Sequence, residues 1–270
     1  MGNQPLLASR IKEKLKRGEV SIGSWISLAH VSNAEILAAA GYDWIAIETE
    51  HTAIDMREVL RLIMAIEGRG AVPMVRLAGI DPLQAKTALD SGAAGLLVPL
   101  VNTRAAAELA VTMAKYPPQG FRGMGVARAH GYGKHFAEYV SQANEDTLLV
   151  VQIEHIEAVR NIEEILSVPG IDGTFIGPYD LSASLGIPGQ IDHPEVQAAK
   201  QRVLEVTLAH GLTAGIHLLH PDQAAANLRQ CIVEGYRFIA LGSDIMFLGE
   251  SSRSLHTIAR NIIAESMRPG

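Results

Sequence analysis

Two carboxylates in this sequence are spaced so that they could hold a metal ion. Gln152 and Glu154 lie two residues apart in an apolar run that predicts a strand, so their side chains share one face. Asp180 follows the next apolar run, which predicts the neighbouring strand. Two carboxylates from neighbouring strand ends suit a hard divalent cation that keeps positions for its substrate, with Mg²⁺ first and Mn²⁺ or Co²⁺ as alternatives. A carboxylate pair satisfied by arginine or backbone donors is the other interpretation.

A histidine and an arginine follow other apolar runs. His51 ends the run Glu48-Thr49-Glu50-His51, and a neutral imidazole is the usual general base near neutral pH. A helix cap or a surface position is the alternative for His51. Arg76 ends the next predicted strand, and its guanidinium suits a carboxylate or an enolate oxygen. An internal salt bridge of Arg76 to Glu48 or Glu50 is its alternative.

No lysine of this sequence falls at the end of a predicted strand. The chain has seven, and all of them fall in predicted helices or loops. A Schiff-base aldolase needs a desolvated lysine at its site. The distribution therefore disfavours imine chemistry and favours a metal ion as Lewis acid.

The residues above must be positioned by an alternating series of strands and helices. Apolar runs predict strands at 21–28, 44–48, 72–77, 95–100, 148–153, 173–176, 213–216 and 238–241. Amphipathic stretches predict helices at 33–40, 55–68, 81–91, 103–116, 156–167, 194–210, 222–234 and about 252–266. Eight such units form a (β/α)₈ barrel or a doubly wound sheet. Strand number and length favour the barrel, and both phosphate-binding glycine motifs are absent from the sequence.

A single domain spanning residues 1–270 is expected, because no linker rich in Gly, Ser or Pro divides the chain. In a barrel the working residues lie at the C-terminal ends of the strands, which is where the residues above fall. One connection is long: 116–144 is rich in glycine and contains basic residues from Arg122 to His135. Long ordered loops are usually functional, and a mobile surface excursion is the alternative.

Composition excludes several classes of protein. The 270 residues carry 23 Lys plus Arg against 29 Asp plus Glu, a net charge of −6, which argues against nucleic acid and anionic lipid as partners. An apolar share of 48% supports a large core. The single cysteine, Cys231, is expected to be buried. Residues 1–20 lack the apolar core of a signal peptide, and no membrane-length apolar run occurs, so a soluble, cytoplasmic protein is expected.

Several motifs together resemble the HpcH/HpaI aldolase family. They are Trp25, Glu48-Thr49-Glu50-His51, Arg76, DPLQAKTALDSGAAGLLVP at 81–99, YPPQGFRG at 116–123, VQIE at 151–154 and FIGPYDLS at 175–182. Each motif is modest by itself, but their order and spacing are specific, and the similarity spans about residues 15–264. Members are metal-dependent (class II) pyruvate aldolases, such as 4-hydroxy-2-oxoheptanedioate and 2-dehydro-3-deoxyglucarate aldolases.

The resemblance implies a role for each matching residue. Glu154 and Asp180 match the metal ligands, and Gln152 matches a substrate contact beside them. Arg76 matches an arginine that steadies the carbonyl or enolate oxygen, and His51, with Glu48, matches the base. The groups around the substrate are matched by Gly177, Pro178, Tyr179 and Trp25. The implied reaction is cleavage or condensation of 4-hydroxy-2-keto acids, giving pyruvate and an aldehyde through a metal-bound pyruvate enolate. No nucleic acid or membrane partner is implied.

Asp90 matches a carboxylate that raises the basicity of the histidine. It falls at the end of a predicted helix, near the barrel's bottom, so it could reach His51 only from a neighbouring chain. The family's hexamers permit this. The last helix, about 252–266, is often exchanged between partner barrels in this family.

The sequence also departs from the family pattern. Glu48 stands where several relatives carry Asp, and Tyr179 where some carry Ala. His217 and His220 lie outside the shared pattern. We hypothesise that Tyr179, His220 and the loop 122–135 set aldehyde preference. Citrate-synthase-like condensation with a thioester, and a non-catalytic barrel that binds keto acids, are the alternative functions.

Overall fold

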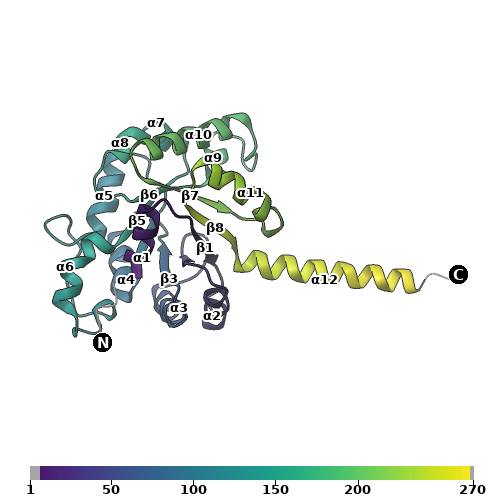
Figure 1. Cartoon of the computed structure of the whole chain (residues 1–270), viewed down its shortest axis with the longest axis horizontal. Coiled ribbons are helices and arrows are strands. Elements are labelled where there is room, and N and C mark those ends of the chain that lie inside the picture. The colour runs from purple at the N-terminus through teal and green to yellow at the C-terminus, as the bar shows by residue number, and fades with distance from the viewer. Residues whose placement is uncertain (1–6, 268–270) are drawn as a thin grey trace.

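Eight parallel strands form a closed barrel in the computed structural model, which describes residues 7–267 and gives only the backbone of residues 7, 8, 221–223 and 225. Residues 1–6 of the N-terminal segment and the last three residues lie outside this described part. Each strand pairs with the next along the chain, and β8 pairs with β1 (Figure 1). The strands are β1 (Ser21–Ile26), β2 (Trp44–Glu48), β3 (Val72–Arg76), β4 (Gly95–Val98), β5 (Leu148–Ile153), β6 (Gly173–Ile176), β7 (Thr213–Leu218) and β8 (Phe238–Ser243). The (β/α)₈ barrel expected from the sequence is confirmed.

Most of the helices surround this barrel, whereas the first helix lies at its N-terminal end and the last extends away from it. The helices are α1 (Leu7–Lys16), α2 (Val31–Ala39), α3 (Met56–Gly68), α4 (Pro82–Ser91), α5 (Arg104–Ala114), α6 (Phe136–Asp146), α7 (Ile156–Arg160), α8 (Ile162–Leu166), α9 (Pro178–Ser184), α10 (Pro194–Ala209), α11 (Pro221–Glu234) and α12 (Asp244–Ser266). The predicted helix 156–167 is divided at Asn161 into α7 and α8. The long connection 116–144 is not all loop, because it contains the short 3₁₀ helix η1 (Arg128–His130) and most of α6.

Strand side chains alternate between the barrel interior and the layer under the helices. On β5, Leu148 and Val150 belong to the interior cluster, whereas Leu149, Val151 and Ile153 pack under the helices. The interior is filled by large side chains, with the rings of Trp44 and Phe238 stacked at 4.1 Å. Gly23 makes room for Trp44, since a Cβ there would lie 2.1 Å from the indole. These side chains fill the interior of the barrel, which is therefore a packed core and not a channel.

Helix α1 closes the N-terminal end of the barrel. Its buried Ile11 joins the interior cluster, and it contacts β1, β3, β5 and α6. Lys12 lies 3.0 Å from a carboxylate oxygen of Asp172, and Lys14 lies 2.7 Å from Asp43. These two lysines therefore attach α1 to the N-terminal end of the barrel.

The last helix leaves the barrel. Figure 1 shows α12 extending away from the other elements as a single long helix. Its residues beyond Ile245 include the exposed apolar side chains of Leu248, Leu255, Ile258 and Ile262. No helix among residues 7–267 is long and apolar enough to cross a bilayer.

Candidate active site

A cavity of about 310 Å³ lies at the C-terminal mouth of the barrel. Most of the residues singled out in the sequence line it: Trp25, Glu48, His51, Arg76, Gln152, Glu154, Gly177, Pro178, Tyr179 and Asp180. They come from the ends of β1, β2, β3, β5 and β6 and from the residues that follow these strands. The alternation of each strand brings them together, as the barrel geometry requires.

Arg76, the last residue of β3, lies between two carboxylates at the end of β2, those of Glu48 and Glu50. Glu48 and Arg76 are register partners, and an Arg76 Nη2 hydrogen donates to Glu48 Oε2. The second guanidinium nitrogen, Nη1, is 3.0 Å from Glu50 Oε2, an ion pair without hydrogen-bond geometry. The salt bridge left open as an alternative in the sequence is therefore present to both carboxylates. It also fixes the guanidinium at the cavity wall.

The other oxygen of Glu48 shapes the loop that carries His51. Glu48 Oε1 accepts hydrogen bonds from the backbone N–H of Glu50 at 2.7 Å and of His51 at 3.2 Å. The Thr52 hydroxyl donates to the Glu48 carbonyl at 2.5 Å. The imidazole of His51 is 60% exposed, with Nε2 3.8 Å from Glu50 Oε2. One buried glutamate thus holds the arginine and the histidine loop in a fixed relation.

Glu154 is a buried carboxylate whose hydrogen bonds, among the described residues, come from a backbone amide and a side-chain amide and not from a cation. Its Oε1 accepts from the Leu100 N–H and its Oε2 from Gln152 Nε2, both at 2.8 Å. Burial raises the pKa of Glu154 to about 7; the Leu100 hydrogen bond lowers the pKa, and the Glu50 charge raises it. Leu100 adopts a left-handed conformation, φ 54°, which is strained for this residue type. The strained backbone conformation of Leu100 thus occurs at the residue whose N–H binds Glu154.

The backbone directly after β6 approaches Glu154 closely because residue 177 is a glycine. A Cβ at Gly177 would lie 2.7 Å from both Cβ and Oε2 of Glu154. Pro178 then begins α9, whose first turn carries Tyr179 and Asp180, both exposed at the cavity. The Asp180 charge raises the pKa of both Glu154 and Glu50, so three carboxylates share one electrostatic field.

The oxygen atoms at this end of the barrel fit a divalent cation. Glu154 is desolvated, Gln152 Oε1 is buried without a hydrogen-bond partner in the described part of the chain, and Asp180 adds a second carboxylate. Within residues 7–267, no group of three or more His, Cys, Asp or Glu side chains is arranged to hold a metal ion. A two-carboxylate site leaves the remaining positions to water or substrate, as hard cations that bind substrate require.

His217 also belongs to this cavity, although the sequence placed it beyond a strand ending at 216. β7 continues to Leu218, so His217 faces the interior and lines the cavity. Its ring stacks on Trp25 at 5.6 Å, and Arg76 covers the indole at 4.7 Å. Burial lowers the pKa of His217 to about 4, although its hydrogen bond to the Gly242 carbonyl acts in the opposite direction. Side chains alternate between the two faces of a strand, so extending β7 by two residues from Gly215 would have predicted that His217 faces the barrel interior.

Asp90 and the basic loop residues lie elsewhere. Asp90 is on the last turn of α4, does not line the cavity and pairs with Arg122 at 2.7 Å. The Arg122 side chain is buried over the rings of Tyr116 and Tyr139. His220 is half exposed, with Nδ1 3.7 Å from Glu250 Oε1. Asp90 is thus near the barrel's bottom, as expected.

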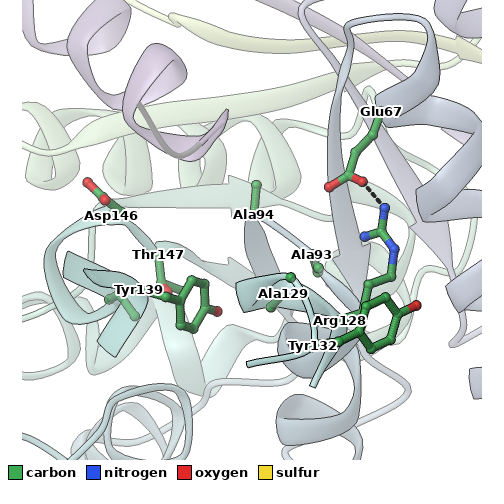
Figure 2. A pocket seen from close by; sticks show the side chains of 12 residues that line it. Glu67, Ala93, Ala94, Arg128, Ala129, Tyr132, Tyr139, Asp146 and Thr147 are labelled. Atoms are coloured by element: carbon green, nitrogen blue, oxygen red, sulfur yellow. Dashed lines mark hydrogen bonds and ion pairs between the residues drawn. The ribbon is translucent and has the colours of Figure 1, made fainter. Parts of the chain in front are cut away.

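A second cavity, of about 360 Å³, lies at the N-terminal ends of β4 and β5, under η1 and α6. Figure 2 shows its lining, with Arg128 and Glu67 joined by an ion pair beside Tyr132. Arg128 also donates to the Ser91 carbonyl at 2.9 Å. At the other side of this cavity, burial raises the pKa of Asp146, and the charge of Lys12 lowers it. This cavity is larger than the first, but both Nη atoms of its arginine are bound, by the Ser91 carbonyl and by Glu67.

Comparison with known proteins places this geometry among related chains. Residues 21–250 match the HpcH/HpaI aldolase/citrate lyase family. The chain is 41% identical over 249 residues to the 2-keto-3-deoxy-L-rhamnonate aldolase of Escherichia coli K12, covering 91% of each chain. An HpcH/HpaI aldolase/citrate lyase family structure from Burkholderia cenocepacia J2315 is 36% identical, with a TM-score of 0.87 over 93% of this chain and 99% of that one. The structure of a citrate synthase is 30% identical, with a TM-score of 0.81 over 95% and 98%.

Proposed function

The chain belongs to the HpcH/HpaI aldolase/citrate lyase family, and we propose that the cavity at the C-terminal mouth of its barrel is the active site. The enzyme is a carbon–carbon lyase that cleaves 4-hydroxy-2-keto acids to pyruvate and an aldehyde, or joins them. The observation that carries the site assignment is Glu154: a desolvated carboxylate, beside an unpartnered amide oxygen, at the mouth of the barrel.

Glu154 and Asp180 would hold the divalent cation that this class of aldolase uses. Mg²⁺ is the proposed ion, and Mn²⁺ or Co²⁺ are alternatives, because the donors are hard oxygens. A cation bound there supplies Lewis-acid polarisation of the 2-keto group. Gln152, through its unpartnered Oε1 and its Nε2, and the segment Gly177–Tyr179 would contact the keto acid beside it.

His51 is the proposed general base. In the cleavage direction it takes the proton of the C4 hydroxyl, the C4–O bond becomes the aldehyde carbonyl, and the C3–C4 bond breaks. The electron pair of that bond moves towards the C2 oxygen, where the guanidinium of Arg76 stabilises the negative charge. Protonation at C3 then gives pyruvate. Glu48 would position both groups, since it binds Arg76 and the backbone of His51.

The oligomer is part of the proposal. Asp90 is at the opposite end of the barrel from His51, so it would raise the basicity of a histidine in a neighbouring copy. A homohexamer would permit this, with α12, whose apolar side chains are exposed, packed on another barrel. Tyr179 and His220 remain proposed determinants of aldehyde preference. The loop 122–135 lines the cavity at the N-terminal end, so it would influence this preference only in the site of a neighbouring copy. The proposed location is the cytoplasm.

Pyruvate release tests the proposal directly. A panel of 4-hydroxy-2-keto acids, including 2-keto-3-deoxy sugar acids, is cleaved in the presence of lactate dehydrogenase and NADH, with EDTA and then with Mg²⁺, Mn²⁺ or Co²⁺. Activity that disappears with EDTA and returns with metal supports the site. Activity indifferent to chelation removes the metal site at Glu154 and Asp180. Added pyruvate, assayed in each condition, controls for the coupling enzyme.

A second function has a specific observation in its favour. The citrate synthase structure shares this fold with 30% identity and a TM-score of 0.81. Condensation of oxaloacetate with acetyl-CoA would release free CoA, which a thiol reagent detects. Thiol release, together with no pyruvate from any aldol in the panel, would favour the condensation over aldol cleavage.

A further inference from the structure

Three polar groups line the cavity on β7, β8 and β1, the strands that follow β6 around the barrel. Trp25 and Ser243 are register partners on β1 and β8, and His217 lies on β7 with its ring on the Trp25 indole. Trp25 and Ser243 are buried to 4% and 3% exposure, yet Trp25 Nε1 and Ser243 Oγ have no hydrogen-bond partner among residues 7–267. Buried polar atoms without partners are costly and rare, so two on one cavity wall indicate a bound group.

The hydrogen bond of His217 fixes which of its nitrogens faces a ligand as an acceptor. Nε2 lies 2.8 Å from the Gly242 carbonyl oxygen. A carbonyl oxygen only accepts, so Nε2 carries the hydrogen and, in the neutral ring, Nδ1 is an acceptor. Burial lowers the pKa of His217 to about 4, which keeps the ring neutral at physiological pH. No hydrogen bond of Nδ1 is formed within the described part of the chain.

The Gly242 carbonyl is itself held in place. Gly242 has a left-handed φ of 57°, at a point where the β1–β8 register shifts, and a Cβ there would lie 2.5 Å from the Phe247 ring. Such irregularities re-aim backbone and side-chain groups at the rims of barrels. The carbonyl and the imidazole therefore keep one orientation, and the acceptor at Nδ1 is preorganised.

The wall thus combines a hydrogen-bond acceptor at His217, a donor at Trp25 and the Ser243 hydroxyl, which can donate or accept. We propose that this wall binds a hydroxyl group of the substrate, which donates to His217 Nδ1 and accepts from Trp25 Nε1 or Ser243 Oγ. A carboxylate would bring acceptors against the His217 acceptor, and an alkyl group would leave all three atoms unpaired. The proposal rests on the aldolase function and adds that the enzyme prefers hydroxylated substrates over their alkyl counterparts.

Two isosteric substrate pairs test this in the condensation direction. Glycolaldehyde is compared with propanal as acceptor of pyruvate, and hydroxypyruvate with 2-oxobutanoate as donor to a fixed aldehyde. A site built for a hydroxyl discriminates strongly against the analogue lacking it. We expect kcat/KM to favour the hydroxylated member of one pair by roughly 10-fold or more. A preference for glycolaldehyde over propanal places the bound hydroxyl on the aldehyde half of the substrate. A preference for hydroxypyruvate over 2-oxobutanoate places it on the keto-acid half.

His217→Leu removes the acceptor while keeping an apolar side chain of similar size against Trp25. The expected result is that the preferred pair's kcat/KM ratio falls towards 1. His210→Leu is the matched control, since His210 also bonds a backbone carbonyl, at 2.9 Å, but does not line the cavity. That variant should keep the wild-type ratio. If His217→Leu does not fold, Ser243→Ala is measured in the same way and should lower the same ratio.

The outcomes separate this proposal from the aldolase assignment. A wild-type enzyme that condenses pyruvate with both aldehydes, and shows no preference in either pair, overturns the hydroxyl site and leaves the aldolase intact. A preference that survives both His217→Leu and Ser243→Ala also overturns it. Loss of all metal-dependent aldol activity in the wild type contradicts the proposed function instead.

Discussion

The two ends of the barrel hold cavities of similar size, each with one arginine among acidic side chains, but the hydrogen bonds of these groups differ. At the N-terminal end, in about 360 Å³, Arg128 is bound by Glu67 and the Ser91 carbonyl. At the C-terminal mouth, in about 310 Å³, Arg76 faces several carboxylates, and burial raises the pKa of Glu154 and Glu50. Among the described residues, most buried polar atoms without a hydrogen-bond partner, such as Gln152 Oε1, lie at the mouth. Unmet charge and hydrogen-bonding capacity, rather than volume, distinguish the end that does chemistry.

The largest expected effect tests the mouth itself. Glu154→Gln keeps the shape and the hydrogen bond from Leu100 but removes the charge. Loss of a metal ion that contributes several kcal/mol to the transition state corresponds to a fall in kcat/KM of roughly 10⁴-fold. Steady-state pyruvate release at saturating Mg²⁺ measures this. Near-normal activity in this variant, with Gln201→Glu as a surface control, would place the cation elsewhere.

A smaller loss is expected for the proposed base. His51→Ala should lower kcat by roughly 10²–10⁴-fold, the usual contribution of a general base. The melting temperature should not change, because the imidazole is 60% exposed and packs little. Kinetics and thermal unfolding are measured on the same preparation. Normal turnover, or a loss explained by unfolding, would remove His51 from the mechanism.

The pH dependence of stability should report the cost of ionising the buried Glu154 carboxylate. The folded-state pKa of Glu154 is raised to about 7, so the native state binds its proton more tightly than the unfolded chain. Without metal, stability should therefore fall as pH rises from about 4.5 to 7, by about 3 kcal/mol at 1.36 kcal/mol per pKa unit. Urea unfolding across this range, with EDTA, measures the slope. Glu154→Gln should lack this contribution, and an identical slope in both proteins would contradict it.

Asp90 offers a way to break the comparison, since it lies at the N-terminal end. If it supports His51 of a neighbouring copy, Asp90→Asn should move the acid limb of the kcat/KM profile to lower pH and reduce activity about 10-fold, because a nearby carboxylate raises an imidazole pKa by about a unit or more. The pH profile is compared with that of Asp192→Asn, an exposed control. An unmoved profile would leave Asp90 as a partner of Arg122 alone.

The smallest effect belongs to the N-terminal cavity. Glu67→Gln weakens the partly buried pair with Arg128 and should destabilise the fold by about 1 kcal/mol. Turnover at saturating substrate should be that of the wild type. Urea unfolding and pyruvate release together check this. A large loss of activity in a folded Glu67→Gln protein would show that this cavity, too, takes part in the reaction.

Much of the fold could be predicted because buried parallel strands are nearly continuous apolar runs. The bounds of β2, β5 and β6 agree with the sequence prediction. β7 was ended too early, at 216, because a histidine interrupts the apolar run. That histidine is tolerated in the strand by its bond to the Gly242 carbonyl, a contact with a residue 25 positions away that no local pattern reveals.

The site was predictable where it depends on strand ends and not where it depends on pairing. Strand alternation brought Glu154 and Arg76 to one cavity as expected. The double engagement of Arg76 by Glu48 and Glu50 follows from the β2–β3 register, which the sequence does not specify. Likewise, the basic residues of 122–135 read as a functional loop, but Arg122 and Arg128 bind Asp90 and Glu67 in this chain.

Closure of the barrel through β1 and β8 has a consequence for how the chain emerges from the ribosome. Ser24 bonds the carbonyl of Leu241, 217 residues later in the sequence. At about 5–20 residues per second, the edge of β1 stays without its β8 partner for roughly 10–40 seconds of synthesis. An unpaired strand edge is open to pairing with other chains during that time. The nascent protein should therefore depend on holding chaperones, and slowed translation should lower its soluble yield.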